Sequence, residues 1–365
     1  MGGATVEINS FMDELSRERK TIKTDSYDMS VGELINLYKE DDLKLNPAYQ
    51  RLYRWDDDHK TNFIESILIG IPIPPIFVAQ KDDGKWDIVD GLQRISTLLQ
   101  LTGDLPDYEP LTLQGTEALP SLEGMTWETM PIDAKRLLRR TRIGVSIILT
   151  ENSISSQYEL FRRLNTGSVT LESQEIRNCL IIMLDSEFYE KINELKTYEN
   201  YQKCIKLTDD KYKIEYHMEL ILRYFIAKNN KVDYSKYNIA SEKLPKFLDK
   251  ETTNLISDRK FNLEEEIELF KKTFDKLAEH IGDDIFRKYN AEKDKFEGAF
   301  SNSSYEAILV GVALNIDRIN WQTFREKLKK MYSEESFLKA SDRGVKVINR
   351  FRELNAFSRE YFNET

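Results

Sequence analysis

The 365-residue sequence has few cysteines and histidines and no long hydrophobic run. Its two cysteines, Cys179 and Cys204, are too few for a disulfide framework or, unaided, for a zinc site. No apolar run approaches the roughly 20 residues that a membrane-spanning helix needs. The N-terminal segment MGGATVEINSFMDELSRERK also lacks the apolar core of a signal peptide. We therefore expect a cytoplasmic protein.

The sequence also lacks an excess of positive charge, with 53 Lys+Arg against 63 Asp+Glu and a net charge of −10. This balance argues against a protein that coats nucleic acid by charge alone. The basic run KRLLRRTR at 135–142 is a local exception. Such a run is more often the solvated face of a helix, and nucleic-acid contact is the alternative.

The hydrophobic pattern changes along the chain and predicts an α+β protein. A capping box at Ser30 and an acidic start at Asp56 each precede a helical pattern. Two apolar segments within 76–90, joined by an Asp-Gly turn, predict a β-hairpin, and residues 143–149 predict a buried strand. From about residue 170, long amphipathic helical patterns dominate. We expect an N-terminal extension (1–29), a mixed domain with a small sheet (30–150) and an all-helical domain (151–365).

The segment WDIVDGLQRISTLLQL at 86–101 predicts a strand that turns directly into a helix at Asp90-Gly91. Arg94 falls in the first helical turn, where free backbone N–H groups and the helix dipole favour an anion. Glycine lets a phosphate approach the backbone, and an arginine can bind two of its oxygens. The Asp90 carboxylate is suited to bind a metal ion, to orient an attacking water or to form an ion pair with Arg94. The alternative is a tight turn in which Asp90 caps the helix and Arg94 points into solvent.

Two other polar segments stand beside apolar elements. YQRLYRW contains Gln50, Arg51 and Tyr53, although an ordinary strand with inward aromatics would have the same pattern. FRRLNTGSVTLESQEIRN predicts a turn between two helices, with free N–H groups and a left-handed position at Gly167. An ordinary helix–helix corner is the alternative there. We expect three residues of these segments, Arg51, Arg163 and Asn165, to line one pocket together with Asp90 and Arg94.

Together the segments resemble the domain-of-unknown-function 262 family, which includes the N-terminal module of GmrSD-type restriction enzymes. The family's DGQQR motif corresponds to residues 90–94, and its QR-x-Y-x-W motif to 50–55. Two further segments resemble that family, the run ESILIGIPIPPIF at 65–77 and the F-x-RLN-x-G element at 161–167. The resemblance is strong over roughly residues 30–180.

The resemblance implies a ParB/sulfiredoxin-like fold that binds and hydrolyses a nucleoside triphosphate with Mg²⁺ in an anti-phage defence system. Within such a site we expect catalysis from Asp90, Gln93 and Arg94, with Asp90 holding the metal ion or orienting the attacking water. The phosphate-binding residues would be Gln50, Arg51, Tyr53, Gly91, Arg94, Arg163, Asn165 and Gly167.

This sequence departs from the family pattern in two respects. Leu92 replaces the first glutamine of the pentapeptide, which weakens the case for hydrolysis more than the case for binding. No His-Asn-His nuclease motif surrounds His59, His217 or His280. Two hypotheses follow: a nucleoside triphosphatase, or a non-catalytic adaptor that senses nucleotide or DNA and works with a separate nuclease subunit. DNA is an expected partner in either case, and the oligomeric state is left open.

Overall fold

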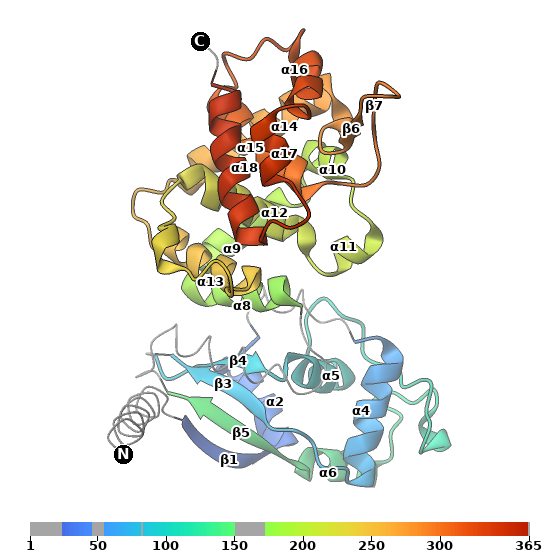
Figure 1. Cartoon of the computed structure of the whole chain (residues 1–365). Coiled ribbons are helices and arrows are strands. Elements are labelled where there is room, and N and C mark those ends of the chain that lie inside the picture. Colours follow the sequence, from blue (N-terminus) through green and yellow to red (C-terminus); the bar gives the residue numbers. More distant parts are fainter. Residues whose placement is uncertain (1–23, 46–54, 82, 150–171, 364–365) are drawn as a thin grey trace, which may run out of the picture. The chain divides into compact units, whose positions relative to one another are not determined.

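The structure is a computed structural model that describes residues 24–45, 55–81, 83–149 and 172–363 (Figure 1). The chain divides into two compact units, residues 1–170 and residues 171–365. The first contains a small mixed sheet and the second is mostly helical, so the α+β class is confirmed. The finer likeness to ParB and sulfiredoxin stays a prediction. No helix in the described ranges is long and apolar enough to cross a bilayer.

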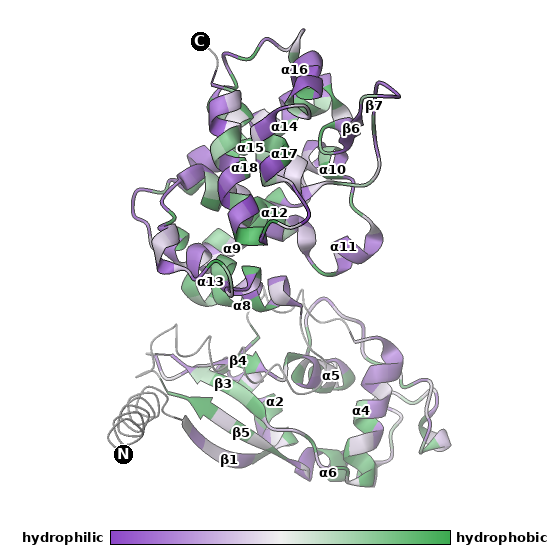
Figure 2. Ribbon diagram, in the orientation of Figure 1, coloured by the Kyte–Doolittle hydropathy of each residue, from purple (hydrophilic) through white to green (hydrophobic). Residues whose placement is uncertain are grey.

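The sheet of the first unit has five strands in the order β1-β5-β3-β4-β2. β3 (Ile76–Gln80) and β4 (Trp86–Asp90) are antiparallel, which confirms the predicted hairpin. β5 (Arg142–Ile148) runs parallel to β3, and β2 (Leu43–Lys44) runs parallel to β4. β1 (Thr24–Ser30) pairs antiparallel with β5 and extends the sheet into the segment assigned to the N-terminal extension. Figure 2 shows β1 as the hydrophilic edge strand beside the hydrophobic β5.

Among the described residues of this unit, four α-helices accompany the sheet: α2 (Val31–Lys39), α4 (Asp57–Ile69), α5 (Leu92–Thr102) and α6 (Ile132–Arg140). The predicted caps are present, because Ser30 Oγ accepts from the Glu33 N–H at 3.2 Å and Asp56 Oδ1 accepts from the His59 N–H at 2.9 Å. The stretch 104–131 contains only a short 3₁₀ turn, Pro120–Leu122. Apolar residues from the sheet and all four helices form one core, which includes Ile64, Val78, Leu98 and Leu138.

The second unit is built from many helices, of which α8, α12, α13, α15 and α18 concern us most. Their bounds are Ser173–Leu184, Tyr216–Asn229, Leu244–Ile256, Asn302–Leu314 and Val347–Tyr361. The others are α9 (Ser186–Leu195), α10 (Glu199–Ile205), α11 (Asp209–Lys213), α14 (Leu263–His280), α16 (Phe324–Met331) and α17 (Glu335–Ala340), with 3₁₀ turns at Tyr234–Lys236 and Gly282–Asp284.

The described part of the unit is mostly helical, in agreement with the expected fold class, and it also contains a short hairpin. β6 (Lys288–Asn290) and β7 (Lys295–Glu297) form an antiparallel hairpin. The Tyr289 and Phe296 rings pack across it, with centroids 5.3 Å apart. Strands of three residues are too short to show an alternating pattern, which explains why the sequence gives no sign of them.

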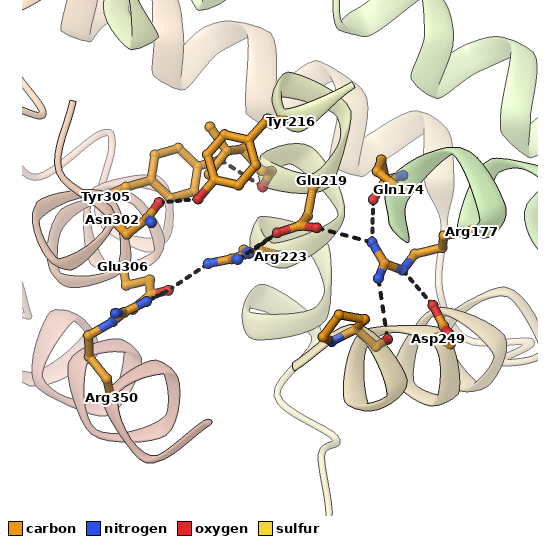
Figure 3. A network of polar contacts seen from close by, with 12 residues as sticks. Gln174, Arg177, Tyr216, Glu219, Arg223, Asp249, Asn302, Tyr305, Glu306 and Arg350 are labelled. Atoms are coloured by element: carbon orange, nitrogen blue, oxygen red, sulfur yellow. Dashed lines mark hydrogen bonds and ion pairs between the residues drawn. The ribbon is translucent and has the colours of Figure 1, made fainter. Parts of the chain in front are cut away.

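A buried chain of alternating charges links five helices of the second unit (Figure 3). Arg177 of α8 donates from Nε to Asp249 Oδ1 of α13 at 2.9 Å, and from Nη1 to Glu219 Oε2 of α12 at 3.4 Å. Arg223 then bonds to Glu219 and to Glu306 Oε1 of α15, the latter at 3.1 Å. Arg350 of α18 completes the chain by donating to Glu306 Oε2 at 2.9 Å. Three arginines face three carboxylates, so the buried network is electrically neutral.

Candidate functional site

The strand-to-helix corner predicted at residues 90–92 is present. β4 ends at Asp90, and α5 begins at Leu92 after Gly91, whose φ is +99°. A Cβ on Gly91 would lie 2.5 Å from Ile76 Cγ2 of the neighbouring strand, which is an impossible contact. Both the backbone angle and the packing therefore require glycine.

Arg94 forms the centre of this corner, and it does not point into solvent. Its Nη1 donates to the carbonyl oxygens of Pro74 and Pro75, the latter at 3.2 Å, and its Nη2 donates to Asp90 Oδ2 at 2.9 Å. Its side chain is only 12% exposed, compared with 31% for Asp90. Burial lowers the pKa of Arg94, and the Asp90 carboxylate opposes this effect. The guanidinium remains charged at neutral pH.

Gln93 connects the corner to the end of the YQRLYRW segment. Its Oε1 accepts a hydrogen bond from the backbone N–H of Trp55 at 3.1 Å, across 38 positions of sequence. The Trp55 ring packs edge-on against Phe63 of α4, with centroids 5.6 Å apart. Two of the three polar segments thus meet at the corner through residues that the structure describes. Leu92 packs against the hydrophobic core and contributes no polar group.

Several predicted site residues lie outside the described residues: Gln50, Arg51, Tyr53, Arg163, Asn165 and Gly167. The shared pocket of Arg51, Arg94, Arg163 and Asn165 therefore stays a prediction, with the contact of Asp90 and Arg94 as the part that the structure describes. The helix predicted to begin near Thr170 begins at Ser173.

The carbonyl groups of Pro74 and Pro75 are the part of the corner that sequence reasoning missed. The IPIPP segment leads directly into β3 and supplies the acceptors for Arg94. Side-chain patterns do not show where a carbonyl points, so the only available signal was the closeness of IPIPP to β3. The corner as a whole places a carboxylate, a buried cation and the N-terminus of α5 together. Gly91, the N-cap residue, has no side chain with which to cap that N-terminus.

No metal-binding cluster accompanies the corner among the described residues, where groups of three or more His, Cys, Asp and Glu with suitable geometry are absent. The histidines have structural surroundings. His59 contacts its helix cap Asp56, His217 packs against Tyr212, and His280 stacks on Trp321. Cys179 and Cys204 are buried and unbridged, and burial raises the pKa of Cys204 to about 12.

Comparison with known protein families gives one match. Residues 31–182 match the family described as GmrSD restriction endonuclease, N-terminal domain. The match includes the whole 90–94 corner and the 65–77 run. A search of curated proteins and a search of solved structures gave no match.

Proposed function

We propose that residues 31–182, which match the GmrSD restriction endonuclease N-terminal domain, form a module of a restriction-type defence system that binds a nucleoside triphosphate and hydrolyses it slowly. The observation that carries the proposal is the Asp90–Arg94 corner within the matched domain. It combines a helix N-terminus whose N-cap residue is glycine, a left-handed backbone at that glycine with little room for a Cβ, and a buried positive charge. These are the features that a polyphosphate needs.

In this proposal Arg94 has two tasks. Its Nη1 and Nη2 atoms hold the Pro74–Pro75 carbonyls and Asp90 in place, while none of the three bonds uses its Nε–H. The charge therefore stays fixed beside the N-terminus of α5, where it attracts phosphate oxygens. Arg51 and Arg163 would supply the further cationic contacts that a triphosphate requires.

The Asp90 carboxylate of the corner is a suitable ligand for a Mg²⁺ ion that binds together with the nucleotide. Magnesium usually binds one or two carboxylates together with substrate phosphates and water, and it does not need an all-protein cage. Asp90 would supply that carboxylate, or else orient the attacking water. Bound Mg²⁺ would neutralise charge that develops on the phosphates. Gln93 acts as a positioning residue, because its Oε1 holds the Trp55 backbone.

One observation favours a second candidate, a non-catalytic adaptor that senses nucleotide or DNA beside a separate nuclease. Leu92 packs on the core at a position where the family motif has a glutamine. The corner therefore has one polar group fewer for ordering a water molecule. Binding depends on Gly91, Arg94 and the helix N-terminus, and these are intact.

Phosphate release by three variants separates the two candidates. If the domain hydrolyses the nucleotide, Asp90→Ala should reduce turnover more than affinity, and Glu128→Ala, an exposed acid of the same unit, should change neither. Leu92→Gln restores the family glutamine and should increase turnover. Nucleotide binding without phosphate release in the wild type, followed by release in Leu92→Gln, would instead support the adaptor.

A further inference from the structure

The outer face of α6 is strongly basic in an acidic protein. Arg136, Arg139 and Arg140 of α6 and Arg142 of β5 are exposed, and we call these four residues the basic face. Leu138, on the opposite side of the helix, is fully buried in the core. Residues 132–142 contain five basic residues and one acid, a net charge of +4, while the whole chain carries −10.

Within the ranges that the structure describes, little neutralises the charge of these arginines. Arg136 pairs with Asp133 at 3.1 Å, and both side chains are well exposed. Arg139 and Lys135 lie over the Trp127 ring, at 5.9 and 5.6 Å from its centroid. Arg139, Arg140 and Arg142 form no ion pair with any part of the chain that the structure describes. Their charge is therefore available to a partner.

We propose that the basic face binds the phosphate backbone of double-stranded DNA. Arginine is suited to phosphate because its planar guanidinium can bind two oxygens at once. Arg136 and Arg140 are four residues apart, about 6 Å along the helix axis, so they can contact neighbouring phosphates of one strand. Together with Asp133 and Leu137 they line a shallow surface groove of about 480 Å³.

We assign only phosphate contacts to the basic face. Residues 132–142 contain no Asn or Gln to pair with adenine, and a phosphate contact needs only the charge and the paired donors of an arginine. Phosphate contacts fix the position of a protein on DNA but carry no sequence information. The inference rests on one part of the proposed function, namely that the first unit is a restriction-type module and acts on DNA. It does not depend on nucleotide binding.

The test is the salt dependence of binding to a fluorescent 20-base-pair duplex, measured by anisotropy with the full chain. Each phosphate contact contributes about −0.9 to the slope of log K against log salt, so four arginines predict a slope of about −3 to −4. The double variant Arg136→Gln, Arg140→Gln loses two of these contacts and should reduce the magnitude of the slope by about 1.8. At 0.1 M salt the same relation predicts a loss of affinity of about 60-fold.

Two control variants distinguish this face from general electrostatics and from misfolding. Arg318→Gln with Arg343→Gln changes the net charge equally at exposed positions of the second unit, and should leave binding within about twofold. Asp133→Asn releases Arg136 from its partner and should tighten binding, a gain that misfolding cannot produce. Equal weakening by both double variants would overturn the proposal, as would binding to anionic phospholipid vesicles but not to the duplex.

The same variants separate this inference from the nucleotide-binding proposal. Calorimetry with Mg²⁺-triphosphate on the Arg136→Gln, Arg140→Gln variant should match the wild type, because the basic face is not part of the Asp90–Arg94 corner. Nucleotide binding without any duplex binding would refute the proposal for the basic face and leave the nucleotide-binding proposal intact. Duplex binding that depends on Arg136 and Arg140, without nucleotide binding, would refute the nucleotide-binding proposal and leave the proposal for the basic face intact.

Discussion

Replacing Arg94 with methionine should destabilise the first unit strongly, because one buried guanidinium holds three partners. The change removes the bonds to the Pro74 and Pro75 carbonyls and to Asp90, and leaves all three acceptors without this donor. Breaking a buried ion pair costs about 3–5 kcal/mol. Asp90 is 31% exposed and regains some hydration, so we expect a loss of about 2–4 kcal/mol.

The assay is urea unfolding followed by tryptophan fluorescence. Trp55, Trp86 and Trp127 belong to the first unit and only Trp321 to the second, so the signal mainly reports the unit that contains Arg94. Arg136→Met is the matched control. It removes an arginine from an exposed pair in the same unit and should cost less than about 1 kcal/mol.

Ligand-dependent unfolding then distinguishes a structural Arg94 from one that also binds phosphate. A nucleotide that binds only the folded protein raises its stability according to concentration and affinity. Losing an arginine–phosphate contact costs about 1.5–3 kcal/mol, so Arg94→Met should weaken nucleotide binding by about 10- to 100-fold. A cost no larger than that of Arg136→Met would refute the structural role. An unchanged nucleotide effect would refute the binding role.

Three further predictions concern other parts of the chain. Gly91→Ala should destabilise the first unit by about 2 kcal/mol or more in urea unfolding, because φ is +99° and a Cβ would clash with Ile76; Gly84→Ala, with open space around it, should cost less. Arg177→Met should destabilise the second unit by about 3–5 kcal/mol, measured by circular dichroism, because it leaves Asp249 and Glu219 partly unpaired in a fully buried site; adding Asp249→Asn should recover part of the loss. Hydrogen bonds from Lys231, from the backbone N–H of Lys260 and from Asn229, the first being the strongest, lower the pKa of Asp258 to about 2 from the ordinary value of 3.8. The contribution of this carboxylate to stability is therefore complete above about pH 4 and is lost as the pH falls through 2. Asp258→Asn should therefore flatten the acid dependence of unfolding over that window, and an unchanged acid limb would contradict the assignment.

Elements with a local signal were predictable from the sequence. The Asp56 cap and the apolar spacing of Phe63, Ile64 and Ile67 predict α4 within a residue or two of its actual bounds. The Asp-Gly turn predicts the β3–β4 hairpin, and the switch of period at Gly91 predicts the start of α5. In each case the information lies within about ten residues of the element.

Features that depend on distant partners were not predictable. β1 has the polar sequence TDSYDMS and forms a strand because it pairs with β5, more than 100 residues later. The weakly patterned stretch after α5 is held by the Glu65 carboxylate, which accepts from the N–H groups of Ala118 at 3.1 Å and Leu119 at 2.7 Å. At the candidate site the sequence identified Asp90, Gly91 and Arg94. It gave no sign that Arg94 binds two proline carbonyls, because their direction is a property of the folded backbone.

Isothermal titration calorimetry of the full chain with ATP, GTP, CTP and UTP, each with and without Mg²⁺, is the decisive experiment for the nucleotide site. We expect heat of binding with at least one triphosphate in the presence of Mg²⁺. Arg94→Met should weaken this binding by about 10- to 100-fold, while Arg136→Met should leave it unchanged. The absence of heat with all four nucleotides, in the presence and absence of duplex DNA, would contradict the claim that the Asp90–Arg94 corner is a nucleotide site.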